Sequence, residues 1–210
     1  MFLAPEFAIY LLIIITGFFI GIISVKRRAP LYPVVLLLGI TFLCELVSRI
    51  FAYKIGNSYP PYHILNLFQS ALWGVFFYRQ FKTRHKKQLS LFLSSLLVIY
   101  SIINTINEGF LVMPYNDLKA QAFVLIALGF TLFFEKLEEG PEVNIFKDPI
   151  FITVVGLIWF SLVSFIFINF HKFLVAKVFS DSILRLINYV SNYVYYLTLL
   201  AAIILQRTKK

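Results

Sequence analysis

Seven long apolar segments constrain the fold of this chain more than any other feature of its sequence. Each is close to the roughly 20 residues that an α-helix needs to cross a bilayer. The connections, such as Gly56-Asn57-Ser58 and Gly140-Pro141, are short and rich in turn residues. We therefore expect one all-α domain over residues 1–210, a transmembrane bundle of seven helices. The expected spans are Phe7–Val25, Leu31–Tyr53, Tyr62–Phe81, Leu89–Asn107, Leu118–Leu137, Ile150–Phe170 and Ile183–Gln206.

The composition also favours a membrane protein and argues against a soluble domain or a nucleic-acid-binding protein. Hydrophobic residues make up 60% of the chain and charged residues 14%, whereas soluble domains are roughly half apolar and about a quarter charged. The net charge of +9 would suit a nucleic-acid partner, but most Lys and Arg residues lie in the short connections, so we expect no nucleic acid. The single cysteine, Cys44, excludes an internal disulfide and a multi-cysteine metal site. We expect neither a metal nor a cofactor.

Basic residues divide the connections into two unequal sets. Cytoplasmic connections of membrane proteins carry the excess of Lys and Arg. We therefore expect the N-terminus outside and the C-terminus in the cytoplasm of a multi-pass protein of the bacterial inner membrane. The first segment lacks a basic leader and a cleavage site, so we expect no removable signal. One set holds Lys26, Arg27, Arg28, Arg79, Lys82, Arg84, Lys86, Lys87, Lys136, Lys147, Arg207, Lys209 and Lys210, and the other holds Lys54, Lys119, Lys172 and Lys177.

Polar residues within the expected spans gather in the half that this orientation places outside. Thr41, Glu45 and Arg49 recur every four residues and so share one helix face. Polar groups in lipid are costly and usually face the interior of a bundle. This pattern predicts an outward-facing polar cavity in which Arg49 and Arg185 hold an anionic group, Glu45 balances their charge and amides orient the ligand. The predicted ligand-binding residues are Glu45, Arg49, His63, Asn66, Gln69, Asn104, Arg185, Asn188 and Asn192.

Structural roles account for the same residues. Glu45 and Arg49 could neutralise each other within one helix, or pair with Arg185 and Asp181. The amides could serve as interhelical hydrogen-bond partners, worth about 0.6 kcal/mol each on average. His63 and His171 fall near the interface, where a solvated histidine needs no function. The acidic connection Glu135, Glu138, Glu139 and Glu142 is expected to be solvated.

Two motifs resemble those of the CAAX-type intramembrane glutamate proteases. Cys44-Glu45-Leu46-Val47-Ser48-Arg49 resembles the family's Glu-Glu-x-x-x-Arg with its first Glu replaced, and Phe167-Ile168-Asn169-Phe170-His171 resembles Phe-x-x-x-His. The third family motif, a His followed by Asn or Asp, has no counterpart. The resemblance implies peptide hydrolysis by water activated between Glu and His, with that apparatus incomplete. A retinal protein is excluded, because the last expected span has no Lys for a Schiff base.

The whole pattern is similar to small uncharacterised seven-helix membrane proteins of bacteria. The similar parts are the segment Tyr62–Gln69, the Phe-rich span after Asp148-Pro149, and the last span, which is rich in Asn and Tyr. This resemblance implies the seven-helix count and no particular activity.

These observations predict a sensory or ligand-binding membrane protein rather than an enzyme, with no catalytic residue assigned. A small-molecule transporter is the first alternative, although it would need polar residues in the cytoplasmic half as well. An intramembrane hydrolase is the second. Besides membrane lipids and a small-molecule or anionic ligand, the expected partner is a protein that binds at the basic connection Lys82–Lys87 or the acidic connection Glu135–Glu142.

Overall fold

The computed structural model describes residues 5–138, 144–177 and 181–208, and the side chains of Pro5, residues 171–177, 181–182 and Arg185 are not among those described. The described residues form α-helices and no strand, which confirms the all-α class. The apolar segments coincide with the helices, except that α4 begins at Arg84 and α6 runs on to Lys177, where charged residues continue the helix. The elements are α1 (Pro5–Ser24), α2 (Tyr32–Ile55), α3 (Pro60–Gln80), α4 (Arg84–Glu108), α5 (Tyr115–Leu137), the short 3₁₀ helix η1 (Ile145–Lys147), α6 (Pro149–Lys177) and α7 (Asp181–Thr208).

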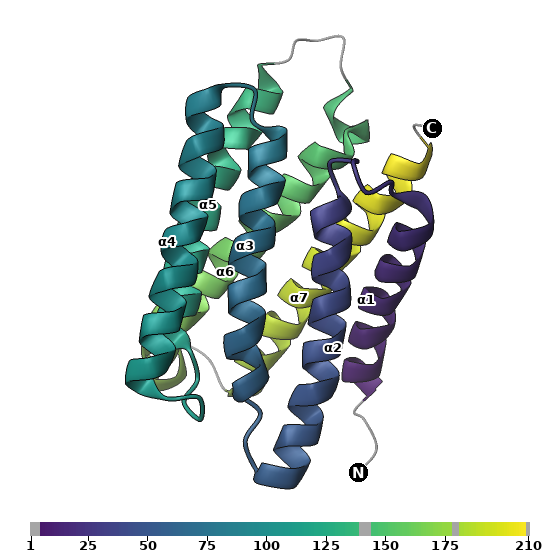
Figure 1. The fold of residues 1–210 in the computed structure, drawn as a ribbon. Coiled ribbons are helices and arrows are strands. Elements are labelled where there is room, and N and C mark those ends of the chain that lie inside the picture. The colour runs from purple at the N-terminus through teal and green to yellow at the C-terminus, as the bar shows by residue number, and fades with distance from the viewer. Residues whose placement is uncertain (1–4, 139–143, 178–180, 209–210) are drawn as a thin grey trace.

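The seven helices run alternately up and down the bundle (Figure 1). At one end, which we call the Pro5 end, α1, α3, α5 and α7 begin and α2, α4 and α6 finish. At the other, the Thr208 end, the directions are reversed. The basic connections α1–α2 and α3–α4 therefore lie at the Thr208 end, together with the α5–α6 connection, which carries both Lys and Glu residues.

Six of the helices form a closed ring, and the seventh lies outside it. Around the ring α1 contacts α2, α2 contacts α3, α3 contacts α5, α5 contacts α6, α6 contacts α7, and α7 returns to α1. Helix α4 packs against α3 and α5, and it forms one flank of the bundle in Figure 1. The ring surrounds an interior to which α4 has no access.

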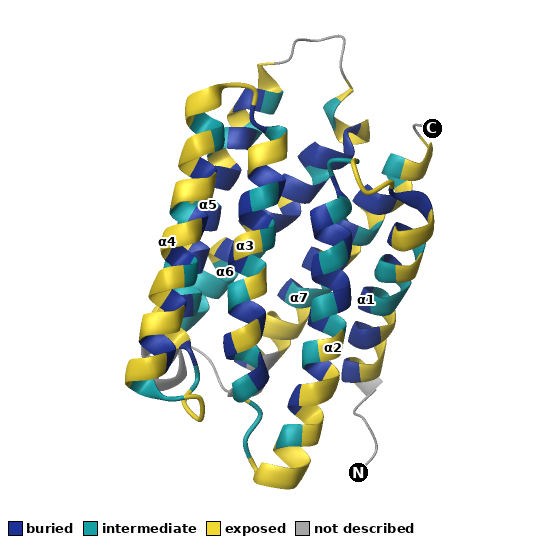
Figure 2. Cartoon of the chain, viewed as in Figure 1, coloured by how far each residue is buried: buried dark blue, intermediate teal, exposed yellow. Residues whose placement is uncertain are grey.

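Helix α4 presents small and polar residues to the bundle and large apolar residues to its surroundings. Its buried residues, Ser90, Ser94, Leu97, Ser101, Asn104 and Thr105, share one helix face. On the opposite face Phe92, Ile99 and Ile106 are exposed, as the yellow outer surface of α4 shows in Figure 2. Small residues let helices approach closely inside a membrane, where lipid accommodates the apolar face.

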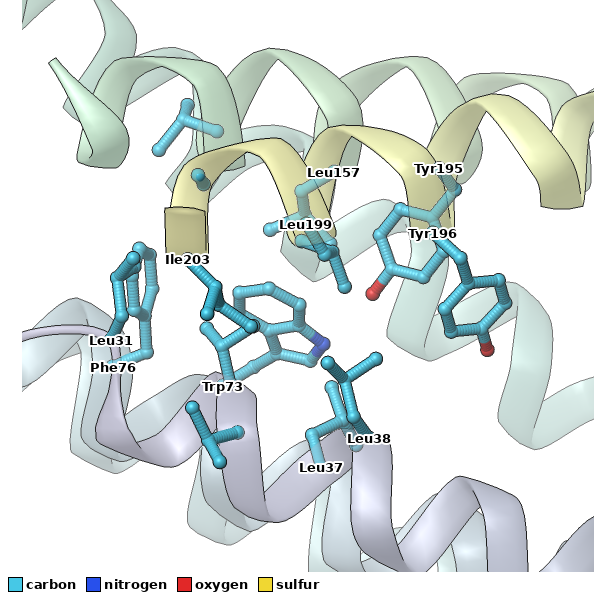
Figure 3. Packing of buried hydrophobic residues seen from close by; sticks show 14 of the residues in the cluster. Leu31, Leu37, Leu38, Trp73, Phe76, Leu157, Tyr195, Tyr196, Leu199 and Ile203 are labelled. Carbon is cyan, nitrogen blue, oxygen red and sulfur yellow. The ribbon is translucent and has the colours of Figure 1, made fainter. Parts of the chain in front are cut away.

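The interior at the Thr208 end is filled by tightly packed apolar side chains. Trp73 and Phe76 of α3 are 2% and 0% exposed, and they belong to one cluster with Leu38 of α2 and with Leu199 and Ile203 of α7. Figure 3 shows the Trp73 indole between the α2 and α7 side chains. Buried side chains of this kind typically interdigitate with few voids.

Six of the described helices are long and apolar enough to cross a membrane, and α3 is the exception. The chain is therefore a multi-pass membrane protein on composition and length. Helix α3 contacts α2, α4 and α5, and its polar residues face these neighbours. Polar residues such as His63, Asn66 and Ser70, which lower the hydropathy of α3, are buried, and polar groups that face other helices are tolerated in a membrane protein.

Candidate functional site

A cavity of about 760 Å³ occupies the ring interior from the middle of the bundle to the Pro5 end. Every ring helix contributes to the described lining, whereas α4 contributes no residue to it. The lining residues are Tyr10 from α1; Thr41 and Glu45 from α2; Tyr62, Leu65, Asn66 and Gln69 from α3; Met113 from the α4–α5 connection; Tyr115, Leu118, Lys119, Gln121, Ala122 and Leu125 from α5; Phe160, Ser161, Ser164, Phe167, Ile168 and Asn169 from α6; and Asn188, Asn192 and Tyr196 from α7.

The cavity reaches the Pro5 end and is blocked toward the other. Met113 and Tyr115, at the α4–α5 connection, mark its outer limit. Tyr196 and Phe160 lie deepest, and Phe160 stacks on the buried Tyr195 with ring centroids 4.4 Å apart. One turn beyond Tyr195, Leu199 belongs to the packed core, so the described interior offers no continuous path to the Thr208 end.

Glu45 is the central polar group of the cavity. Its side chain is 9% exposed. Each carboxylate oxygen accepts one hydrogen bond from a phenol, Oε1 from Tyr10 and Oε2 from Tyr62, both at 3.1 Å. These bonds join α1, α2 and α3 around one carboxylate. Because both donors are neutral, they satisfy its oxygens without neutralising a charge.

A second cavity of about 320 Å³ adjoins the first. The two share Tyr10, Glu45, Tyr62, Asn188 and Asn192 as lining residues. Arg49 lines this smaller space and not the larger one. Its guanidinium carbon lies 3.8 Å from the centroid of the Phe7 ring, which is the geometry of a cation–π contact.

The ion pair considered for Glu45 and Arg49 is not formed. No ion pair between these two is found among the described residues, which have ion pairs at Lys86–Glu135 and Lys136–Asp148. Arg49 is exposed and engages Phe7, while Glu45, one turn deeper, engages tyrosines. The alternative pairing with Arg185 and Asp181 involves side chains outside the described residues.

Asn66 lies on the α3 wall of the cavity, and its side-chain amide nitrogen makes no hydrogen bond. Its residue is 2% exposed, and Nδ2 has no hydrogen-bond partner. Gln121 of α5 donates through Nε2 to Ser70 Oγ at 3.0 Å and to the backbone carbonyl oxygen of Asn66 at 3.4 Å. These contacts fix the α3–α5 wall and leave the Asn66 amide group as an unused donor at the cavity.

Two of the predicted binding residues lie outside both cavities. His63 is 1% exposed, and its ring nitrogens contact Thr105 Oγ1 at 2.9 Å and the Val112 carbonyl oxygen at 2.8 Å. Asn104, on α4, donates to Glu108 Oε2 at 3.2 Å. His63 joins α3 to α4 and to the α4–α5 connection, whereas this bond of Asn104 stays within α4. The polar pattern of single helices could not distinguish such residues from cavity lining.

Three further predicted residues line the cavity. Gln69, Asn188 and Asn192 line it, and Asn192 Nδ2 donates to the Asn188 carbonyl oxygen one turn earlier at 2.8 Å. Arg185 belongs to α7, but its side chain lies outside the described residues. The structure therefore brings together Glu45, Asn66, Gln69, Asn188 and Asn192 around one space and separates His63 and Asn104 from it.

Several lining residues were not predicted from the sequence. Tyr10 and Tyr62 hold the Glu45 carboxylate, yet tyrosines near span ends are typical of the membrane interface, so neither suggested a binding role. Ser161 and Ser164 lie in a very apolar span where serine is common at helix contacts. Lys119 belongs to the less basic set of connections and lines the cavity from the first turns of α5.

The acidic connection also differs from expectation. Glu135 is 8% exposed, not solvated. Its Oε1 accepts from the Lys82 backbone N–H and its Oε2 from Lys86 Nζ, both at 2.8 Å. Glu135 therefore joins α5 to the basic α3–α4 connection. Glu138 is exposed, while Glu139 and Glu142 lie outside the described residues.

The histidines of the chain do not contribute to the described lining of the cavity. Both ring nitrogens of His63 are occupied elsewhere. His171, of the second protease-like motif, has a side chain outside those described. In the described part of the chain no group of His, Cys, Asp or Glu is arranged to hold a metal ion. No protein-family model, curated protein or solved structure matches this chain.

Proposed function

We propose that this chain is a membrane protein that binds a small molecule within the bilayer, in a cavity entered from the Pro5 end. The observation that carries the proposal is the cavity of about 760 Å³ whose described lining comes from all six ring helices. Binding sites for small ligands are typically concave spaces of about 300–1,000 Å³, mostly apolar with a few placed polar groups. Glu45, Asn66 and Gln69 are such polar groups here.

A sensory role follows from how the cavity is built. A ligand that contacts six helices can change their mutual packing, and the basic Thr208 end offers a cytoplasmic face from which a protein partner could detect the change. This proposal takes α3 as a seventh span, since its 21 residues extend about 30 Å. It also takes the excess of Lys and Arg at the Thr208 end as cytoplasmic, which directs the cavity outward.

A transporter is the second candidate, favoured by one observation. A space open toward one end and closed by packed side chains toward the other is also the shape of a carrier in one of its two states. The closing residues here, Trp73 and Phe76 of α3 with Leu199 and Ile203 of α7, are 0–2% exposed. Movement of α3 against α7 would be required to open this layer.

Filling the cavity tests the proposal. Ser164 lines it on α6, and Ile166, two residues on, is 51% exposed to the surroundings. A mixed panel of small metabolites would be screened for those that raise the unfolding temperature of the protein in lipid nanodiscs. We expect stabilising compounds to act on the wild type and on Ile166→Trp but not on Ser164→Trp.

Two results would contradict ligand binding in this cavity: an absence of stabilising compounds in the panel, or compounds that stabilise Ser164→Trp as well as the wild type. Accumulation of a stabilising compound inside sealed proteoliposomes would favour the transporter, and binding without accumulation would favour the sensory protein.

A further inference from the structure

We propose that the ligand of this cavity is an organic amine, bound through its ammonium group to Glu45 with its apolar part against the aromatic and aliphatic wall. The inference rests on the proposed binding function and adds the chemical class of the ligand. It replaces the anionic ligand that the arginines of the sequence suggested.

The first step is that Glu45 forms no ion pair with any side chain that the structure describes. It is the one acidic residue in the described lining of both cavities. Its contacts are the hydroxyls of Tyr10 and Tyr62, and the nearest arginine along α2, Arg49, lies over the Phe7 ring. A carboxylate removed from water without a cation is costly, and a ligand cation would compensate for that cost.

The second step is that the carboxylate retains capacity to accept. A carboxylate has about four lone-pair sites, and each oxygen of Glu45 accepts one hydrogen bond. A primary ammonium carries three donors and no acceptor. The two phenols also hold the carboxylate in place, so that binding an ammonium group would require no reorganisation of its side chain.

The third step concerns the rings around Glu45. Tyr10 and Tyr196 meet edge to face with centroids 5.3 Å apart, and Tyr196 and Phe160 line the deep part of the cavity. The face of an aromatic ring attracts cations, whereas it offers nothing to an anion. Leu65 and Leu125 supply an apolar surface nearby, which suits a hydrocarbon or aromatic ligand body.

Of the two arginines that suggested an anion, Arg49 does not line the larger cavity, and the side chain of Arg185 is not among those described. Arg49 lines only the smaller cavity, and its guanidinium group lies over the Phe7 ring. The one basic residue in the described lining of the larger cavity is Lys119, in the first turns of α5, toward the Pro5 end. The unpaired Asn66 Nδ2 could donate to an acceptor on the ligand body.

The test compares three probes of one shape: 2-phenylethylamine, the neutral 2-phenylethanol and the anionic 3-phenylpropionate. Binding to the full chain in nanodiscs would be measured by calorimetry and by the shift in unfolding temperature. We expect the amine to bind most tightly. Glu45→Gln, which keeps the side-chain shape, should weaken amine binding about tenfold or more, the scale of a charge-assisted hydrogen bond.

Glu108→Gln is the matched control. Glu108 lies at the same end of the bundle, outside both cavities, and accepts from Asn104 and Asn116, so its substitution should leave amine affinity unchanged. If Glu45→Gln does not fold, the order of the three probes on the wild type decides by itself.

The inference is overturned if the alcohol or the acid binds as tightly as the amine, if no amine binding is found, or if Glu45→Gln binds the amine unchanged. In each of these cases the proposed function still stands when other panel compounds bind in a manner that Ser164→Trp abolishes. The proposed function itself fails when no compound binds in a manner that Ser164→Trp abolishes.

Discussion

At the scale of single residues, His63 shows how a polar side chain can serve helix packing rather than binding. The Val112 carbonyl oxygen can only accept, so Nε2 of His63 donates to it at 2.8 Å. In the neutral ring Nδ1 then accepts from the Thr105 hydroxyl at 2.9 Å. One imidazole thus ties α3 to both α4 and the α4–α5 connection, in a site that is 1% exposed.

Replacing His63 by Ala should destabilise the bundle without weakening the binding of a ligand in the cavity. The change leaves the Thr105 hydroxyl, in a residue that is 8% exposed, without its acceptor. One such unsatisfied buried group costs about 1–3 kcal/mol. Unfolding in nanodiscs would be followed by circular dichroism, and amine affinity by calorimetry. Unchanged stability, or affinity that falls while stability holds, would contradict the structural role.

A double-mutant cycle provides the control. Thr105→Val removes one of the same hydrogen bonds from the α4 side, so its effect and that of His63→Ala should not add. Additive losses would mean that the two side chains stabilise the protein independently.

At the scale of helices, the contact of α3 with α4 depends on a glycine. A Cβ atom at Gly74 would overlap the Ser94 side chain and come within 3.7 Å of the Ser90 carbonyl oxygen. The two backbones can therefore approach closely only because Gly74 has no side chain. Close approach through small residues is the main source of helix association in lipid.

Gly74→Ala should therefore weaken the docking of α4, by about 1–3 kcal/mol as for other overpacked contacts. Ala71→Val on the exposed side of the same helix adds bulk where nothing is in contact and should have little effect. Unfolding temperatures of the two variants provide the comparison. Ser94→Gly should recover part of the loss in the Gly74→Ala background, and an absence of any recovery would contradict the proposed overlap.

The helices themselves could be predicted from the sequence because apolar length is a local property. The segment Leu118–Leu137, for example, falls within α5 (Tyr115–Leu137). The exclusion of α4 from the ring could not be predicted, since it depends on the fit of Ser94 against Gly74. The extension of α6 beyond Phe170 was missed because a charged residue ends an apolar run without ending a helix.

The candidate site was predictable to a similar extent. Glu45 and Asn66 stood out because polar groups are rare in such helices, and both line the cavity. Their partners did not stand out, since Tyr10 and Tyr62 resemble interfacial tyrosines until three helices are packed together. Asn104 was assigned to the cavity because its helix was taken to face the interior, whereas α4 lies outside the ring.

At the scale of the whole molecule, the two ends of the bundle differ in chemistry. The Thr208 end carries Arg27, Arg28, Arg79 and Lys147 next to the cluster of buried apolar side chains, while the cavity lies at the Pro5 end. Anionic lipids of the cytoplasmic leaflet attract such basic connections. The same charges that orient the chain would thus place the cavity on the outer face.

Labelling of single cysteines tests this orientation in a Cys44→Ser background. Lys54 at the Pro5 end and His85 at the Thr208 end are both exposed. With an impermeant maleimide, the Lys54→Cys variant should be labelled in intact spheroplasts, and the His85→Cys variant only after lysis, because positive connections stay cytoplasmic. The reverse pattern would direct the cavity to the cytoplasm. Labelling of both cysteine variants in intact spheroplasts would place positions 54 and 85 on the same side, so that α3, the one helix between them, could not cross the membrane.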